Sequence, residues 1–449
     1  MEKNIKPNGF ALIPFLSFIV IYLGAGAILA AKGVEFAFYQ FPAVVAILFA
    51  TIVGFAIFKG TIDENFAIFA KGAGNPDIMC MLMIFLLAGG FSAVAKAMGG
   101  VDSTVNLGLS IIPAQYVTAG VFIIAAFLSF ATGTSMGTVG AVTPIAIGLV
   151  DKAGLSMSLV MGACLCGALF GDNLSMISDT TISATRTQKV ELKDKFRSNF
   201  GIAIPAALIT VVLLLVFGAP ETVVQVQQLD YSMIKVLPYL IVILCALVGM
   251  NVFLVLILGT VSAGAIGIAL GDMTFLSFTQ EIWNGFQGMI EVFLLSIFIG
   301  GIAEMTKEFG GIAWILEKIK KFLKGRKSAQ CGNALFAGLC DVATANNTIA
   351  IITAGQVASD VSREYGVDPR KTASILDISA CVVQGMLPYS AQFLTIVALS
   401  EGRVDPIGVI GHNWYLIILA ICMVISFFIP KMDALLIKGK WNWDTNKAE

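Results

Sequence analysis

Charged residues are scarce in this chain, and histidine is almost absent. Only 13% of its 449 residues are Asp, Glu, Lys or Arg, whereas globular domains carry roughly 25% charged residues. The net charge of −1 predicts no nucleic-acid partner. The only close cysteine pair, Cys164 and Cys166, has no second pair nearby, and the single His is far away in the sequence. This pattern predicts buried thiols, no cofactor and no metal site of the zinc type.

Apolar side chains and glycine are abundant instead. Hydrophobic residues make up 57% of the chain, with 45 Gly and 32 Phe, as expected where helices pack closely in lipid. Lys3 and Lys6 precede an apolar run, Phe10–Ala31, that is longer than the core of a signal peptide. These features predict an all-α polytopic membrane protein whose main partner is the lipid bilayer.

Two pairs of apolar segments are too short to cross a membrane. Arms of about 12–16 residues, at 1.5 Å per residue, fall short of the ~30 Å hydrocarbon core. Each pair is joined by a polar tip and is predicted to form a re-entrant hairpin: Tyr116–Ala131 with Val139–Val150, and Ser328–Leu339 with Thr348–Ala358. About ten further segments are predicted to span the membrane, and two of them are interrupted by polar residues: Ser156–Phe170 continued by Ser178–Thr187, and Lys371–Gln384 continued by Ala391–Ser400.

The two halves of the chain match each other. Gly89-Gly90 falls on Gly300-Gly301, and Lys96 falls on Lys307, at a constant offset of 211 residues. Each half therefore has five spans and one hairpin, and an odd number of spans inverts the second half relative to the first. The predicted organisation is a first inverted repeat (1–217), a linker (218–231), a second inverted repeat (232–430) and a cytoplasmic C-terminal tail (431–449).

The basic residues follow this topology. One face receives all of the 28 Lys and Arg residues except five, which are Lys32, Lys96, Lys152, Lys235 and Arg403. Basic residues accumulate on the cytoplasmic side of membrane proteins. The N- and C-termini are therefore predicted to be cytoplasmic, in a multi-pass protein of the cell (inner or plasma) membrane.

Inverted repeats with broken helices are typical of secondary transporters. A broken helix exposes carbonyl oxygens that can replace the water around Na⁺, and N–H groups that suit a carboxylate. The first half supplies an oxygen-rich, acidic cluster in which Asp179 also has the sequence context of a helix N-cap. The predicted Na⁺ ligands are Thr132, Thr134, Ser135, Asp172, Asn173, Ser175 and Asp179.

The corresponding positions of the second half are neutral. Their donors and acceptors suit a polar organic substrate or a second cation site of lower charge, although Pro388 is explained equally well as a simple helix breaker. The predicted substrate residues are Asn346, Asn347, Thr348, Pro388, Tyr389, Ser390 and Gln392. The candidate proton sites are Asp172, Glu291 and Asp377.

Two stretches of the first half carry a family resemblance. TGTSMGTVGAVTPIAIG and the following FGDNLSMISDTT resemble the NhaC family of Na⁺/H⁺ antiporters, within the ion transporter superfamily. The resemblance implies Na⁺ as the coupling ion, held by Thr134, Ser135, Asp172 and their neighbours. It also implies elevator-like alternating access, and a homodimer.

The chain departs from the family pattern at two places. Met176 stands where the pattern has Pro, and Arg186 lies in the segment ISATRTQ that follows the SDTT element. These departures favour a Na⁺-coupled transporter of a small amino acid or organic acid, with Na⁺/H⁺ antiport without an organic substrate as the alternative. A membrane-embedded aspartyl protease is disfavoured because its G-x-G-D element is missing around Asp172 and Asp272, and alternating-access repeats argue against a channel.

Overall fold

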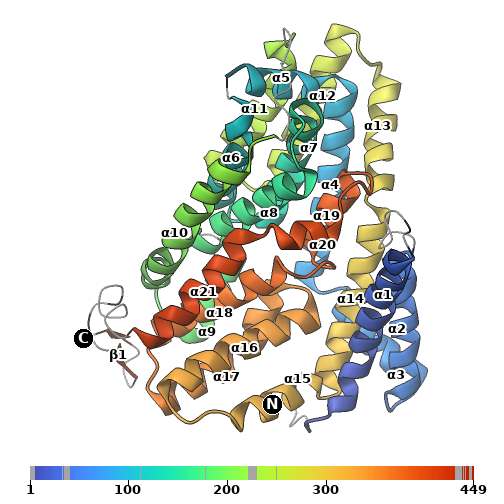
Figure 1. Ribbon diagram of the computed structural model, residues 1–449. Coiled ribbons are helices and arrows are strands. Elements are labelled where there is room, and N and C mark those ends of the chain that lie inside the picture. The colour runs from blue at the N-terminus through green and yellow to red at the C-terminus, as the bar shows by residue number, and fades with distance from the viewer. Residues whose placement is uncertain are drawn as a thin grey trace.

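The computed structural model describes residues 6–32, 34, 41–111, 113–176, 178–220, 230–248, 250–429, 437, 439, 441–443 and 447–448 (Figure 1). Most of the linker and most of the C-terminal tail lie outside these residues. The described chain is almost entirely helical, with one two-stranded antiparallel sheet near its end. Its elements are η1 (Gly9–Leu12), α1 (Ile13–Ala31), α2 (Ala43–Ile57), α3 (Ile62–Ala73), α4 (Pro76–Ala97), α5 (Gly100–Ile111), α6 (Ala114–Thr132), α7 (Ser135–Ala153), α8 (Met157–Leu174), α9 (Asp179–Gln188), α10 (Leu192–Phe217), α11 (Met233–Leu247), α12 (Val252–Leu270), α13 (Phe275–Gly288), α14 (Ile290–Glu308), α15 (Gly311–Lys320), α16 (Arg326–Thr344), α17 (Asn347–Tyr365), α18 (Pro369–Gln384), α19 (Ala391–Leu399), α20 (Pro406–Gly411), α21 (Trp414–Phe428), β1 (Trp441–Asn442) and β2 (Lys447–Ala448).

Several of these helices can cross a membrane. Within the described residues, six helical segments are long and apolar enough, or seven if the sharply bent pair α5 and α6 counts as one span. Helix α10 shows the expected outer surface, because Leu208, Val212 and Val216 are all more than half exposed. Exposed apolar stripes of this kind suit contact with lipid tails rather than with water. The prediction of an all-α integral membrane protein is confirmed.

Some helices differ from those predicted. The arms α6, α7, α16 and α17 have 19 residues each, longer than the apolar runs that predicted them. The arms are longer because each helix continues beyond its apolar run into polar residues. Helices α3 and α13 were not predicted; both begin with a capping box, at Thr61 and Thr274.

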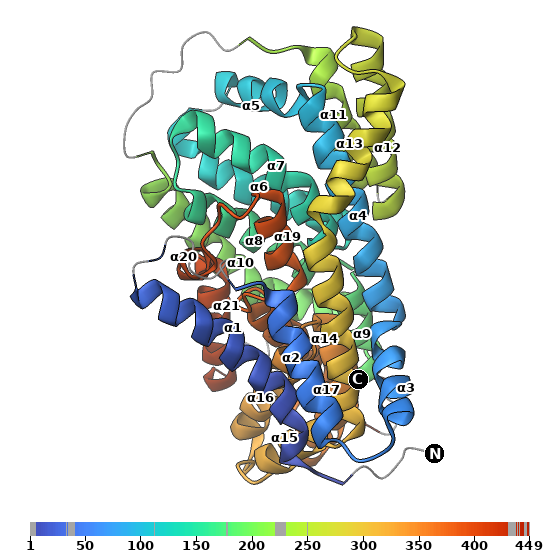
Figure 2. The ribbon, with the colours of Figure 1, turned by 90° about the vertical axis from the view of Figure 1, so that its right-hand side faces the viewer.

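The helices form two groups that pack side by side. In one group, α1–α4 pack with α11–α14, and α4, α13 and α14 run along the length of the molecule (Figure 2). In the other, α6–α10 pack with α16–α18 and α21. The groups meet chiefly where α7 and α19 contact α4 and α14, so the centre of the molecule lies between them.

The repeated glycines mark two helix crossings. A Cβ at Gly89 would overlap the carbonyl oxygen of Gly285 where α4 crosses α13. A Cβ at Gly72 would likewise overlap the carbonyl oxygen of Gly300 where α3 crosses α14. Small residues let helix backbones approach closely in membranes. The glycine pairs that revealed the internal match therefore serve the same packing purpose in both halves.

The contact between α6 and α8 is equally close and gives a stability prediction. A Cβ at Gly171 would overlap the carbonyl oxygen of Ala126, while a Cβ at Gly120 would meet nothing within 4 Å. We expect Gly171→Ala to destabilise the protein by about 1–3 kcal/mol, because overpacking forces the backbones apart. Gly120→Ala should leave stability unchanged or raise it by a few tenths of a kcal/mol. Thermal unfolding of both variants in detergent would check this, and equal melting temperatures would contradict the close crossing.

Candidate cation and substrate site

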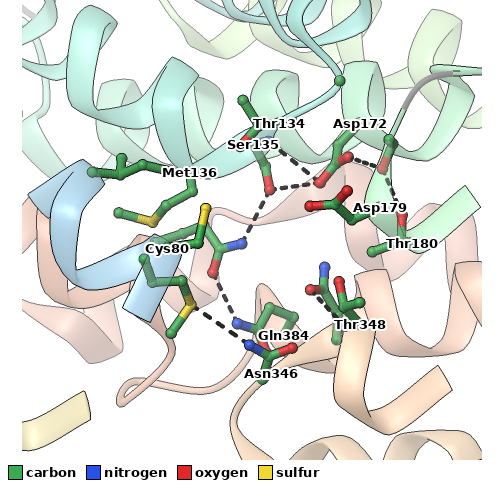
Figure 3. A pocket seen from close by; sticks show the side chains of 16 residues that line it. Cys80, Thr134, Ser135, Met136, Asp172, Asp179, Thr180, Asn346, Thr348 and Gln384 are labelled. Atoms are coloured by element: carbon green, nitrogen blue, oxygen red, sulfur yellow. Dashed lines mark hydrogen bonds between the residues drawn. The ribbon is translucent and has the colours of Figure 1, made fainter. Parts of the chain in front are cut away.

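Four breaks in the helical structure meet around one cavity (Figure 3). Two are the hairpin tips, between α6 and α7 and between α16 and α17, and two are the interruptions between α8 and α9 and between α18 and α19. The cavity has a volume of about 80 Å³. Its lining residues come from both halves of the chain, with α4 of the first half among them: Cys80, Met81, Ile84, Gly133, Thr134, Ser135, Met136, Asp172, Ser178, Asp179, Thr180, Asn346, Asn347, Thr348, Gln384 and Gln392.

At each hairpin tip, one residue has a left-handed backbone conformation, and the next residue is the N-cap of the second helix. Gly133 has φ 70°, and the hydroxyl of Thr134 then accepts a hydrogen bond from the N–H of Gly137 at 3.4 Å. In the second hairpin Ala345 has φ 47°, and Asn346 Oδ1 accepts from the N–H of Ile349 at 2.9 Å. The N-termini of α7 and α17 therefore begin at the cavity, where their free N–H groups favour negative charge.

Asp172 is the acidic centre of the site. It lies in the last turn of α8 and is 6% exposed. One carboxylate oxygen accepts from the Ser135 hydroxyl at 2.7 Å, and the other accepts from the Ser178 hydroxyl at 2.5 Å. Within the described part of the chain no Lys, Arg or His forms an ion pair with Asp172. Its charge is thus held by neutral donors, which leaves it available to a mobile cation.

The other wall of the cavity is neutral. Gln392 donates to the hydroxyl of Ser135 at 3.0 Å and accepts from Gln384 Nε2 at 2.9 Å. Gln384 also donates to the carbonyl of Ala345 at 3.3 Å. This chain of amides joins the two halves across the site. Asp179, an exposed residue at the start of α9, points its carboxylate into the same space (Figure 3).

The structure brings together eight of the residues that the sequence predicted for binding. They line the cavity from both halves: Thr134, Ser135, Asp172, Asp179, Asn346, Asn347, Thr348 and Gln392. Sequence reasoning missed Ser178, Thr180 and Gln384, which also line it. Gln384 was detectable in principle, because it follows Asp172 by 212 residues, the spacing that also separates the two hairpin tips.

Six other predicted residues do not line the cavity. The Thr132 hydroxyl donates to the carbonyl of Leu128 at 2.9 Å, and the Asn173 amide donates to Asp377 at 2.7 Å. Tyr389 packs against Phe15 and Phe18 while its hydroxyl donates to a backbone carbonyl of α16. The remaining three are Ser175, Pro388 and Ser390, which are buried next to the helix breaks.

The candidate proton sites have different surroundings. Asp377 forms an ion pair of 2.5 Å with Lys195, and both side chains are 1% exposed. The charge distribution places Lys195 with the basic residues of the cytoplasmic face, where solvated loop residues are expected. The structure corrects this expectation, because Lys195 is buried in α10. Glu291 is exposed and lines a separate hollow of about 260 Å³. Asp341, in α16, is fully buried, and neither of its carboxylate oxygens has a hydrogen-bond partner within the described residues.

The sequence was also compared with known proteins. The model of the Na⁺/H⁺ antiporter family matches residues 5–219 and 222–430. The chain belongs to this family. Membership confirms the resemblance noted in the sequence and indicates a transmembrane antiporter rather than an enzyme. Na⁺ is accordingly the ion that family membership implies.

Relatives of this Na⁺/H⁺ antiporter family chain include exchangers with different cargo. The Na⁺/H⁺ antiporter NhaC of Alkalihalophilus pseudofirmus is 26% identical over 78% of this chain and 81% of its own. The malate-2H⁺/Na⁺-lactate antiporter of Bacillus subtilis is 24% identical over 69% and 73%, respectively. The arginine/ornithine antiporter ArcD of Halobacterium salinarum is 26% identical over 85% and 84%. Among solved structures, the YdaH transporter of Alcanivorax borkumensis matches with a TM-score of 0.42 and 12% identity, over 94% of this chain and 98% of that one.

Proposed function

We propose that this antiporter family member couples Na⁺ to the movement of a small amino acid or organic acid. Na⁺ binds at Asp172, with Ser135, Thr134 and Asp179 as further oxygen donors. The observation that carries the proposal is the buried Asp172 carboxylate, which faces a cavity and, among the described residues, has only neutral donors as partners. A hard cation such as Na⁺ takes carboxylate, hydroxyl and carbonyl oxygens, by the same reasoning that applies to Ca²⁺ and Mg²⁺.

The neutral wall supports an organic substrate. Asn346, Asn347, Thr348 and Gln392 offer amide and hydroxyl groups opposite Asp172. A site for one water needs about 10–15 Å³, so the cavity of about 80 Å³ has room for a small polar molecule besides the ion. Two of the relatives are named for organic cargo, malate and lactate in one and arginine and ornithine in the other. The NhaC relative favours the alternative, Na⁺/H⁺ exchange without an organic substrate.

We also propose that the chain is an inverted duplication, residues 1–217 and 232–430, joined by the linker. Support comes from conformations that recur 212 residues apart: left-handed residues at Gly133 and Ala345, N-caps at Thr134 and Asn346, and N-caps at Ser178 and Ser390. The boundary between the two stretches that the family model matches also lies inside this linker. An inverted pair of repeats would let the two halves exchange conformations between outward and inward access.

The proposed orientation places both termini in the cytoplasm of a cell-membrane protein. Four of the five basic residues expected on the outer face are paired with acids, which offsets their charge there. The ion pairs, at distances of 2.7–2.9 Å, are Lys96 with Glu401, Lys152 with Asp102, Lys235 with Asp272 and Arg403 with Asp151.

The proposal of a homodimer follows from family resemblance alone.

Transport in proteoliposomes tests the proposed function. A panel of labelled amino and organic acids is offered with Na⁺ or with K⁺ on one side. The proposal expects uptake of at least one compound that depends on the Na⁺ gradient. No uptake across the panel, together with dissipation of a pH gradient when Na⁺ is added, would instead establish exchange without an organic substrate.

Asn347→Ala tests the neutral wall separately. Asn347 lines the cavity from the start of α17. Loss of one hydrogen bond to the substrate should raise its Kd about tenfold, equivalent to about 1.4 kcal/mol, with Na⁺ affinity unchanged. Gln356→Ala, on the exposed side of the same helix, is the control and should change neither. An effect of Asn347→Ala confined to Na⁺ affinity would mean that both hairpin tips bind cations.

A further inference from the structure

A second polar cluster lies beside the Asp172 site and is sealed from solvent. The Lys195 ammonium, at the start of α10, donates to the backbone carbonyl of Asn173 at 2.6 Å. It also donates to the Thr181 hydroxyl at 2.6 Å and pairs with the Asp377 carboxylate at 2.5 Å. These side chains are all buried, and they come from α8, α9, α10 and α18. We call the residues Asn173, Thr181, Lys195, Asn199 and Asp377 the Lys195 cluster.

The groups around the ammonium are those expected of an alkali-cation site. A carbonyl at the C-terminal end of a broken helix, a hydroxyl and a carboxylate are the oxygen ligands that a hard cation takes. Asn199 holds two of these oxygens in place, because its amide nitrogen donates to the Asn173 carbonyl and to Asp377. Its Oδ1 has no hydrogen-bond partner within the described residues, the ammonium included. Asn199 is fully buried. An unpartnered buried oxygen in this position is costly in a merely structural cluster.

We propose that the Lys195 ammonium permanently occupies a second cation site of this transporter. This inference rests on the proposed Na⁺ site at Asp172, from which it differs in one respect. Asp172 has no basic partner within the described residues, whereas Asp377 has Lys195 at 2.5 Å. The wild-type protein therefore exchanges one Na⁺, and the tethered cation supplies the second positive charge in every state.

The position of the cluster explains why a fixed cation is useful there. Asn173 follows Asp172 in the chain, so the same helix end carries a ligand of each site. Asp377 lies on α18 of the second half, and Lys195 and Asn199 lie on α10 of the first. A cation at this point neutralises the buried carboxylate and holds the end of α8 against α18. With lysine in this role, that contact does not depend on the Na⁺ concentration on either side of the membrane.

The test compares two ways of removing the ammonium. Lys195→Ala removes the charge and leaves an oxygen-lined space, whereas Lys195→Met removes the charge but keeps most of the volume. Na⁺ is titrated against K⁺ at constant ionic strength, and the thermal stability of the purified full-length protein is followed. The slope of stability against the logarithm of Na⁺ concentration reports the number of ions bound on folding. We expect this number to rise from about one in the wild type to about two in Lys195→Ala, and to stay near one in Lys195→Met.

Each outcome decides a different question. A wild type with no Na⁺ response would overturn the proposed Na⁺ site. A normal wild-type response with no added ion in Lys195→Ala would overturn the second site alone. A third outcome is that Lys195→Ala cannot be purified even in high Na⁺, whereas the double variant Lys195→Met with Asp377→Asn, which lacks both charges, can be. The oxygens of the cluster would then be unable to hold Na⁺, and the inference would be wrong.

Discussion

Asp172→Asn should weaken Na⁺ binding by at least about 100-fold, equivalent to about 3 kcal/mol, because removing one charge of a buried pair costs about that much. The fold should survive, since an Asn side chain can still exchange hydrogen bonds with the hydroxyls of Ser135 and Ser178. Labelled Na⁺ binding to purified protein, and Na⁺-dependent thermal stability, measure the change.

Asp179→Asn is the matched control for this prediction. Both residues line the cavity, but Asp172 is 6% exposed while Asp179 is solvent-exposed at the start of α9. Water competes at the exposed carboxylate, so we expect Asp179→Asn to lower Na⁺ affinity by less than about tenfold. An unchanged Na⁺ titration in Asp172→Asn, or equal losses in both variants, would place the ion elsewhere.

Hydrophobic length and turn chemistry were enough to locate most of the helices. Long apolar runs predicted α4, α8, α10 and α12, and the polar tips around Gly133 and Asn346 predicted the two hairpins. Helices α3 and α13 were not found because polar residues interrupt both sequences, and their apolar faces are explained only by packing against α14 and α4, respectively. Their capping boxes are visible in the sequence, but a search based on hydropathy does not detect them.

The chemistry of the site was predictable from the sequence, but the direction in which each side chain points was less so. Oxygen-rich residues at a helix break indicate an ion site, yet successive residues on a helix point about 100° apart. Asp172 therefore faces the cavity while its neighbour Asn173 turns to Asp377. Gln384 was overlooked because the two halves were aligned one residue out of register at this break. The neutral counterpart of Asp172 was therefore missed, although the 212-residue spacing of the hairpin tips indicates it.

Lys195 shows a limit of reading one chain locally. It precedes an apolar run, in a segment rich in charge, which is the usual position of a solvated loop residue. Its carboxylate partner, Asp377, is 182 residues away in the sequence, and nothing in the spacing of either residue indicates the contact. Burial of an ion pair is decided by how α10 packs on α18, a tertiary property that hydropathy does not encode.

Two buried aspartates of the second half should respond to very different extents to the loss of their carboxylate. Asp377 is paired with Lys195 at 2.5 Å and also accepts from the amides of Asn173 and Asn199. Asp377→Asn leaves the ammonium buried without its counter-charge, and we expect a loss of about 3–5 kcal/mol of stability. Asp341 is equally buried but has no hydrogen-bond partner within the described residues. An isolated ionised carboxylate is so costly to bury that the group takes up a proton instead.

Asp341→Asn therefore replaces one neutral side chain by another of similar size and should change stability by less than about 1 kcal/mol. Chemical or thermal unfolding of both variants, at one Na⁺ concentration and neutral pH, gives the comparison. The double variant Lys195→Met with Asp377→Asn should recover much of the stability lost in Asp377→Asn, because an apolar replacement of a buried ion pair is often neutral. A loss in Asp341→Asn as large as that in Asp377→Asn would show that Asp341 is ionised in the folded protein. It would then have a charged partner, and the carboxylates would have to be reassigned on that basis.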